Sequence, residues 1–310
     1  MNGWQAPRDS FGQTLVELGE THPELFVLNA DVAKATKTEA FAARFPDRYL
    51  NVGIAEQNMA GVAAGLARSG LVPVMSTFAC FAPGRCYDQI RQSIAYSNLN
   101  VKIAATHPGL SVGMDGAIHQ SLDDLALMRA LPGLVVLAPS DAVQTRKALI
   151  RAVEHQGPVY LRIGRLECPN LFPAAEDFVI GKAYTLRDGS DVTLIAHGAT
   201  VQLVWAAAAE LERSGVSVRV LDMPSLKPLD REALRRAARE TGRIVTVEDH
   251  WLCGGLYSAV CEELAAGGPC RIRGIGVGDV FGESGAPGAL YAKHGLTQER
   301  LLQEVARLLA

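Results

Sequence analysis

The sequence lacks several features that mark whole classes of protein. Its 310 residues contain no apolar run long enough to span a bilayer and no run of basic residues, and the formal net charge is only -3. We therefore expect neither a membrane span nor a nucleic-acid-binding surface. The N-terminal segment MNGWQAPRDSFGQ has no basic region followed by an apolar one, so no secretory signal peptide is predicted.

Common catalytic and metal-binding motifs are also missing. There is no GxGxxG after the first predicted strand, and no GxxxxGK[ST], GxSxG or HExxH. The six cysteines form no CxxC pair and have no zinc-ligand spacing with histidine. These absences favour reduced thiols in a cytoplasmic protein and predict no metal ligands in this chain.

What the sequence does contain is a regular alternation of short apolar runs with amphipathic stretches. LFVLN at 25–29, LVPVMS at 71–76 and VKIAA at 101–105 are typical of buried strands. Such alternation predicts an α/β fold with largely parallel sheets flanked by helices. The length favours two consecutive domains, which we place at residues 1–168 and 186–310, joined by a proline-containing linker at 169–185.

Several helices and loops of the first domain are predicted in the same way. Helices are expected at 10–21, 34–45, 85–97 and 141–155, the last capped by Ser140. The loops at 77–83 and 106–120 each follow a predicted strand. Ligands bind outside the carboxyl ends of parallel strands, so these loops should converge on one rim.

The stretch NVGIAEQNMAGVAAG at 51–65 places one carboxylate, Glu56, among small and apolar residues. A carboxylate in such surroundings is costly unless a polar group meets it. Alternatively, Glu56 is a half-solvated residue near a helix N-terminus, where the helix dipole favours it.

The loop THPGLSVGMDGAIHQ carries three ionisable candidates, His107, Asp115 and His119. Long ordered loops of this kind are usually functional, and histidine exchanges protons near neutral pH. The alternatives are a polar surface loop or a zinc site. Phe78 and Phe81 follow the neighbouring strand and either wall a flat ligand or belong to the core.

Together these stretches resemble the C-terminal half of transketolase, a thiamine diphosphate enzyme. The resemblance covers nearly the whole chain and rests on the order and spacing of several segments. They are NADVAKATKT, RYLNVGIAEQNMAGVAAGLA, STFACF, YDQIRQSIAYSNLNV, THPGLSVGMDGAIHQ, DLALMRALPGLVVLAPSD, DMPSLKPLD and VTVEDHWLCGG. It implies a pyrimidine-binding domain followed by the transketolase C-terminal domain, and transfer of a two-carbon ketol unit from a ketose or its phosphate to an aldose or its phosphate.

The resemblance also implies roles for single residues. Glu56 matches the glutamate that hydrogen-bonds the aminopyrimidine of the cofactor and is the first catalytic candidate, with His107 and His119. Phe78 and Phe81 match aromatic residues that wall the pyrimidine.

The substrate-binding candidates come from the same resemblance. His107 matches a residue at the substrate phosphate, Asp115 one that recognises a ketose hydroxyl, and His119 one near the reacting carbons. Arg8 resembles a phosphate-binding arginine, and either Arg162 or Arg165 is expected to supply another.

This chain departs from the family pattern in two ways. Gly84 stands where many transketolases have a third aromatic residue, and Ala35 where a serine often helps to bind phosphate, so the preference for sugar phosphates is open. There is also no Gly-Asp-Gly, the segment that holds the diphosphate through a divalent cation. We therefore expect a partner chain that binds the diphosphate and Mg²⁺, in an assembly with two copies of each chain.

Two other classes of function stay open at this point. The β subunit of a 2-oxo-acid dehydrogenase E1 component has the same domain plan and a similar glutamate, although the spacing of His107, Asp115 and His119 favours transketolase. A non-catalytic assembly partner would keep the domains for their dimer surface alone.

Overall fold

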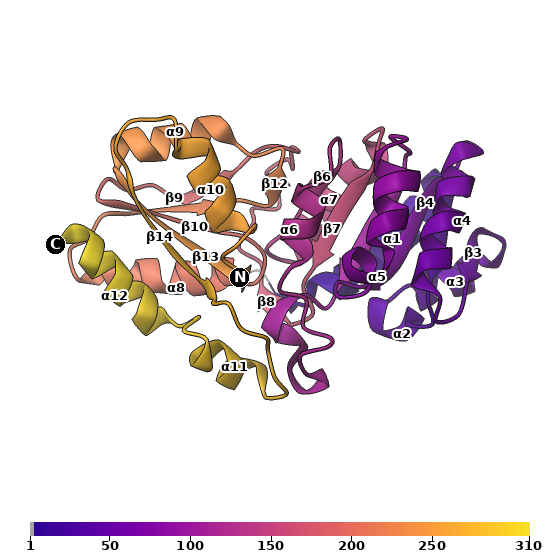
Figure 1. Ribbon diagram of the computed structural model, residues 1–310, viewed down its shortest axis with the longest axis horizontal. Coiled ribbons are helices and arrows are strands. Elements are labelled where there is room, and N and C mark those ends of the chain that lie inside the picture. Colours follow the sequence, from indigo (N-terminus) through magenta and orange to yellow (C-terminus); the bar gives the residue numbers. More distant parts are fainter. Residues whose placement is uncertain (1–2) are drawn as a thin grey trace.

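The computed structural model describes residues 3–310, which form two α/β lobes side by side (Figure 1). The first lobe is built on a seven-stranded sheet, parallel except where β12 joins β6. In order across the sheet, its strands are β12 (Ser225–Lys227), β6 (Val135–Leu137), β7 (Val159–Ile163), β5 (Lys102–Thr106), β4 (Val72–Phe78), β2 (Leu25–Asn29) and β3 (Tyr49–Asn51).

Helices cover both faces of this sheet and bury its apolar residues. They are α1 (Pro7–Thr21), α2 (Ala33–Thr36), α3 (Glu39–Arg44), α4 (Glu56–Arg68), α5 (Ala82–Gln89), α6 (Asp124–Arg129) and α7 (Ala142–Glu154), with short helical segments η1 (Pro46–Arg48), η2 (Ile90–Ala95) and η3 (Gly109–Asp115). On one face Phe11 of α1 packs with Leu149 of α7, and on the other Met59 of α4 packs with Ile90.

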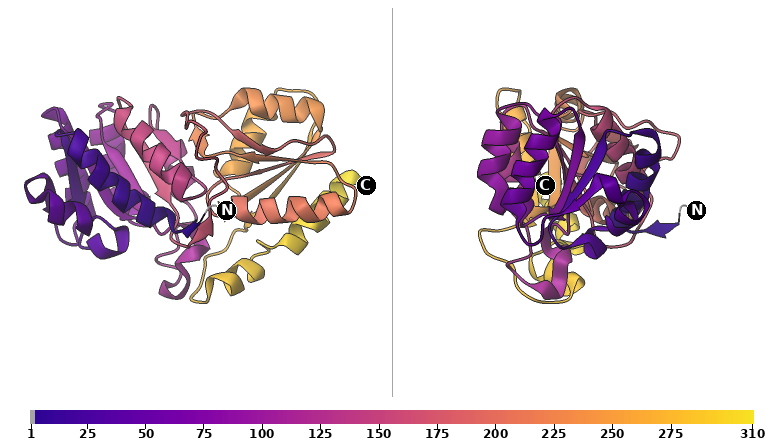
Figure 2. Two further views of the ribbon diagram at one scale, coloured as in Figure 1. Left: turned by 180° about the vertical axis from the view of Figure 1, so that it is seen from behind. Right: turned by 90° about the vertical axis from the view of Figure 1, so that its right-hand side faces the viewer.

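The second lobe has a smaller sheet of five strands in the order β14-β13-β10-β11-β9, with only β9 antiparallel to its neighbour. The strands are β14 (Arg271–Val277), β13 (Arg243–Trp251), β10 (Val192–Ala196), β11 (Val218–Asp222) and β9 (Tyr184–Arg187). The helices are α8 (Thr200–Arg213), α9 (Arg231–Glu240), α10 (Leu256–Leu264), α11 (Pro287–Lys293) and α12 (Gln298–Leu309). Seen from behind, α8 and α12 lie on one side of the sheet and α9 and α10 on the other (Figure 2).

The predicted α/β class with two largely parallel sheets is confirmed. Four local features differ from the predictions. The helix expected at 34–45 is two helices, because Lys37 has a φ of +66° and ends α2. The cap of α7 is Asp141, whose side chain accepts a hydrogen bond from the Gln144 amide, and not Ser140. Strand β4 runs on to Phe78, and α5 begins at Ala82, inside the predicted loop.

The connection between the lobes is anchored to the first lobe. Strand β8 (Cys168–Pro169) pairs with β1 (Trp4–Gln5). Phe172 and Phe178 are buried in the same hydrophobic cluster as α1 and α7. In the opposite direction, β12 reaches from the sequence of the second lobe to the edge strand β6. These exchanges hold the two lobes against each other.

Candidate active site

The candidate site lies at the carboxyl edge of the first sheet, where β4 and β5 end side by side. Phe78, the last residue of β4, is in register with Thr106, the last residue of β5. The next residue, His107, therefore meets Phe78, and their ring centroids are 4.4 Å apart. Parallel pairing thus brings together two predicted site residues that are 29 positions apart in the sequence.

Glu56 is the first residue of α4 and is almost completely buried, with 4% of its surface exposed. The turn before it is held by Asn51, whose side-chain oxygen accepts hydrogen bonds from the amides of Asp31 and Gly53. The helix N-terminus favours a negative charge there. The Glu56 Oε1 accepts a hydrogen bond of 2.7 Å from Nη1 of Arg85, so its environment combines burial with a cationic partner.

An aromatic wall stands beside this carboxylate. Phe78 and Phe81 are stacked, with centroids 5.8 Å apart and ring planes 22° from parallel. The guanidinium of Arg85 lies 4.0 Å from the Phe81 centroid, which links the wall to Glu56. His119 approaches both rings edge-on, at 5.5 Å from Phe81 and 6.3 Å from Phe78.

His107 is buried and held in one tautomer. Its Nε2 lies 2.9 Å from Nη1 of Arg8 and its Nδ1 lies 2.8 Å from Oγ1 of Thr106. Arginine can only donate, so Nε2 accepts and Nδ1 carries the proton. Burial, with Arg8 and Arg165 nearby, lowers the pKa of His107 to about 3. The ring is therefore neutral at physiological pH.

The remaining loop candidates gather around Arg165. Its Nη1 lies 3.2 Å from Oδ2 of Asp115 and donates to the carbonyl of Val112 at 2.7 Å. The His119 Nδ1 lies 3.2 Å from the Asp115 carbonyl oxygen. Asp115 and His119 thus sit on one short, glycine-containing turn, with a cation beside it.

The structure separates the two arginine candidates. Arg162, inside β7, is buried: its Nε donates to Oδ2 of Asp124 at 2.8 Å, and its Nη2 donates to the carbonyl oxygens of Ser121 and Asp249. Arg165 follows the end of the same strand and its side chain is 32% exposed. Of the two, Arg165 is the accessible one, whereas Arg162 links the first lobe to Asp249 of the second.

Sequence reasoning missed Arg85, Asp249 and Tyr291. Arg85 lies four residues after Phe81, and only the helix that starts at Ala82 turns it toward Glu56. Asp249 accepts a hydrogen bond from the amide of Leu110, 139 residues away in sequence, and no local pattern signals such a contact. Within residues 3–310, no group of three His, Cys, Asp or Glu side chains is arranged to hold a metal ion, and no helix has the length and apolarity of a membrane span.

Comparison with known proteins identifies both lobes. Residues 5–170 match the transketolase pyrimidine-binding domain, and residues 181–301 match the transketolase C-terminal domain. The chain therefore belongs to the transketolase family. More particularly, it corresponds to the C-terminal subunit of a split transketolase, and members of this family use thiamine diphosphate.

Individual relatives agree with this assignment over almost the full chain. A putative transketolase C-terminal section of Methanocaldococcus jannaschii is 42% identical over 97% of this chain and 96% of the relative. One of the subunits of the apulose-4-phosphate transketolase of Phocaeicola vulgatus is 41% identical over 96% of both chains. A solved structure described as a split gene transketolase in an inactive beta4 tetramer superposes with a TM-score of 0.92, with 49% identity and 98% of both chains covered.

Proposed function

We propose that this chain is the β (C-terminal) subunit of a two-chain transketolase that moves a two-carbon ketol unit from a ketose to an aldose through thiamine diphosphate. The observation that carries the proposal is the buried carboxylate of Glu56 at the start of α4, beside the stacked rings of Phe78 and Phe81. A flat heterocycle with ring nitrogens needs such a wall and such a hydrogen-bond acceptor.

The residues present fit the pyrimidine half of the cofactor. Glu56 would accept a hydrogen bond from a ring nitrogen and so hold a proton there, and the phenylalanines would cover the ring face. Arg85, whose side chain is 49% exposed, has room to turn away from the carboxylate when the heterocycle enters. When bound, thiamine diphosphate supplies the nucleophilic carbon and the electron sink that ketol transfer requires.

The loop residues would bind the sugar. The neutral His107, whose two ring nitrogens pair with Arg8 and Thr106, would hold the Arg8 guanidinium at the sugar, and Asp115 and His119 suit hydroxyl groups. Arg8 and Arg165 provide positive charge for a phosphorylated end. Ala35 lies beside this group, with its carbonyl oxygen 3.5 Å from Nη1 of Arg8, but it offers no hydroxyl. We infer that the substrate is a sugar or a sugar phosphate, and that these side chains determine which one binds.

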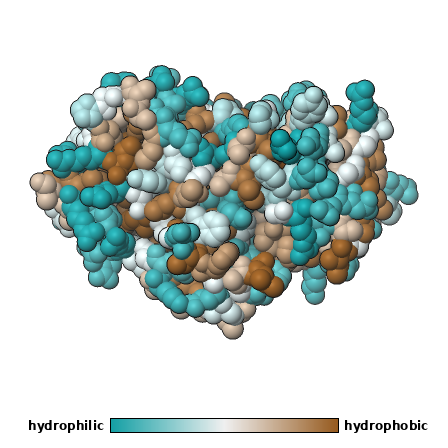
Figure 3. All heavy atoms as spheres, viewed as in Figure 1, coloured by the Kyte–Doolittle hydropathy of each residue, from teal (hydrophilic) through white to brown (hydrophobic). Residues whose placement is uncertain are grey.

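A partner chain would complete the site. We infer that it carries the diphosphate-binding domain and Mg²⁺, in an assembly with two copies of each chain. Support comes from the absence of Gly-Asp-Gly and from the large apolar side chains exposed near the site, Met114, Ile118 and Phe281. In Figure 3 brown atoms lie among teal ones over the lower middle of the molecule, where η3 and α11 are found in Figure 1. We also place the enzyme in the cytoplasm, which the six unpaired cysteines support.

The test is reconstitution with a partner that carries the diphosphate-binding domain. The pair is assayed with D-xylulose 5-phosphate as donor and D-ribose 5-phosphate or unphosphorylated D-ribose as acceptor. We expect ketol transfer by the pair, and a loss of ~100-fold or more in Glu56→Gln with the assembly intact. Glu17→Gln, on the outer face of α1, is the matched control.

Three results would contradict the proposal. Full activity in Glu56→Gln would remove Glu56 from the chemistry. Oxidative decarboxylation of pyruvate without ketol transfer would favour the 2-oxo-acid dehydrogenase alternative, and a wild-type pair without either activity would favour the non-catalytic assembly partner.

A further inference from the structure

The loop that carries the proposed sugar-binding residues is held by the second lobe at both ends. Near its start, the Leu110 amide donates to Oδ1 of Asp249 at 2.9 Å. Just beyond its end, the Trp251 amide donates to the carbonyl of Leu122 at 2.9 Å, and Nε2 of His250 accepts from the Leu125 amide at 3.2 Å. Three consecutive residues of β13 therefore fix both ends of the loop.

The middle of the loop also rests on the second lobe. Ser284 donates its hydroxyl to the Met114 carbonyl at 2.6 Å, and the Gln120 side chain donates to the Glu283 carbonyl at 2.8 Å. Gly113 packs against Gly285 and Pro287. The side of the loop opposite the aromatic wall is thus covered by the segment that leads into α11.

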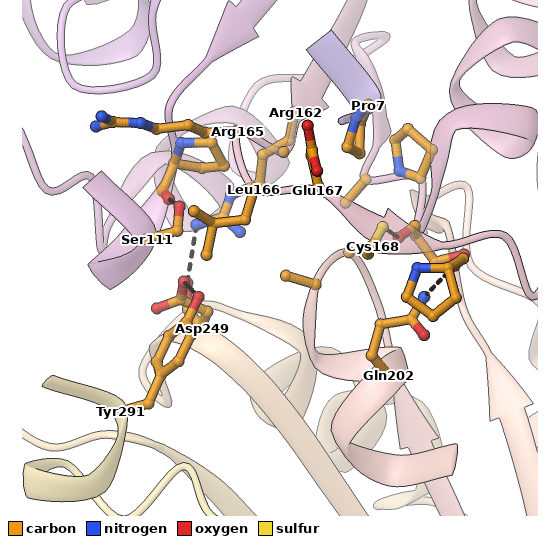
Figure 4. Close-up of a pocket in the computed structure, with 18 of the residues that line it drawn as sticks. Pro7, Ser111, Arg162, Arg165, Leu166, Glu167, Cys168, Gln202, Asp249 and Tyr291 are labelled. Carbon is orange, nitrogen blue, oxygen red and sulfur yellow. Dashed lines mark hydrogen bonds between the residues drawn. The ribbon is translucent and has the colours of Figure 1, made fainter. Parts of the chain in front are cut away.

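Asp249 is the centre of these contacts. It is 4% exposed, and its Oδ2 accepts a hydrogen bond of 3.0 Å from the hydroxyl of Tyr291 on α11. Figure 4 shows Asp249 and Tyr291 side by side, extending from the second lobe toward Ser111 of the loop. Gly109 has a φ of +66°, and any Cβ there would collide with the Asp249 carboxylate, so the loop backbone is packed directly on this side chain.

We propose that Asp249, with Tyr291, is a positioning residue through which the second lobe fixes the sugar-binding face of the 107–120 loop. This inference rests on the proposed function. The Asp249 carboxylate meets the loop backbone at Gly109 and Leu110, while Asp115 and His119 lie further along the same loop near Arg165 and the aromatic wall. Losing the carboxylate would free the loop without touching Glu56, Phe78 or Phe81. The second lobe would therefore act on sugar affinity and leave cofactor affinity unchanged.

The experiment combines hydrogen exchange on the full chain with kinetics of the reconstituted pair. In Asp249→Ala we expect exchange in peptides from 109–120 to rise by ~10-fold or more, because two hydrogen bonds to a buried carboxylate are lost. Peptides from 56–68 should be unchanged. The KM values for D-xylulose 5-phosphate and D-ribose 5-phosphate should rise by ~10-fold, with the Kd for thiamine diphosphate within about 2-fold.

Other variants separate positioning from general damage. Asp249→Asn should restore most of the affinity, since its amide can accept from Leu110 and donate to a rotated Tyr291 hydroxyl. Tyr291→Phe should raise hydrogen exchange in the loop and the KM values as Asp249→Ala does, but by less. If Asp249→Ala does not fold, Tyr291→Phe takes its place as the test variant. Asp222→Ala is the matched control: it removes another buried carboxylate at the lobe interface, which accepts from Ser140 and Gln144 and does not touch the loop. It should leave the KM values unchanged.

Several results would overturn the inference. They are unchanged loop exchange in both Asp249→Ala and Tyr291→Phe, a rise in KM matched by an equal loss of cofactor affinity, or the same kinetic change in Asp222→Ala. These outcomes differ from failure of the proposed function, in which the wild-type pair itself transfers no ketol unit.

Discussion

At the scale of single residues, the side chains of the candidate site are buried or paired with charged neighbours. Glu56 is buried against a cation, His107 is held neutral, and Phe81 has a cation over its face. Glu56 depends on Arg85 of α5 and His107 on Arg8 of α1, while Phe81 is covered by Arg85 one helical turn along the chain. Changing one side chain should therefore alter a defined property and leave the fold in place.

The stacked phenylalanines should contribute to cofactor affinity. Stacking is worth ~0.5–1.5 kcal/mol beyond burial, so Phe81→Leu should weaken thiamine diphosphate binding to the assembled enzyme by roughly 2- to 10-fold. Fluorescence titration with the cofactor measures this directly. Trp205→Leu, in contact with Arg187 on the second lobe, is the control. Equal affinities in Phe81→Leu and wild type would exclude stacking on this ring.

The buried His107 should make stability depend on acid pH. Its folded-state pKa of about 3 lies below the unfolded value of 6.5, so between these values the unfolded chain binds more protons. The free energy of unfolding should then fall as pH decreases from about 6.5 toward 3. Urea unfolding at pH 7.5 and 5 should show a smaller acid loss in His107→Gln than in wild type, with His22→Gln as control. An identical loss in His107→Gln would contradict the assigned neutral state.

At the scale of secondary structure, the sequence was most informative where elements are regular. Apolar runs predicted the central strands β2, β4 and β5. The rule that ligands bind at the carboxyl ends of parallel strands predicted that the segments of Phe78 and His107 meet. Three elements had too little periodicity to be predicted. Strand β12 has three residues between two prolines, and α11 lies in a glycine- and proline-rich segment. Strand β9 is a short edge strand that pairs only with β11.

The same limit applies to the candidate site. Glu56, Phe78, Phe81 and His107 could be predicted to meet because strand ends and chain order bring them together. The choice between Arg162 and Arg165 could not be predicted from the sequence. It depends on the Asp124 carboxylate and the Asp249 carbonyl, which bind the Arg162 guanidinium in the folded chain. Contacts between segments that are distant in the sequence depend on how the folded chain packs, and no local pattern in one sequence predicts them.

The start of α10 should give stability a second pH dependence, of opposite sign. Glu248 on β13 accepts hydrogen bonds from the amides of Leu256 and Tyr257, and burial raises its pKa to about 8 from the usual 4.5. Between these values the folded chain binds more protons, so stability should fall as pH rises from 4.5 to 8.

Glu248→Gln keeps an acceptor oxygen at this position but removes the titration. Denaturant unfolding at pH 6 and 8.5 should show a smaller alkaline loss of stability in Glu248→Gln than in wild type. An equal loss in both proteins would mean that Glu248 is ionised in the folded state throughout this range.

At the scale of the whole molecule, the two lobes form one unit that carries half of the proposed active site. The placement of β12 beside β6 and the hydrogen bond from Arg162 to the Asp249 carbonyl join the lobes, and the second lobe supports the loop of the first. The groups proposed to bind the pyrimidine and the sugar converge on one edge of the first sheet, whereas the sequence has no Gly-Asp-Gly segment for the diphosphate. We therefore expect this chain alone to show no ketol transfer and to gain it only with its partner.

The most direct test of the central claim is the rate at which the thiazolium C2 proton of thiamine diphosphate exchanges with D₂O, measured by NMR after rapid quenching. With both chains present, exchange should be at least ~100-fold faster than with this chain alone or with the Glu56→Gln pair, because in the proposed site Glu56 would hold the pyrimidine proton that this step requires. Equal rates in the wild-type and Glu56→Gln pairs, at equal cofactor occupancy, would contradict the account.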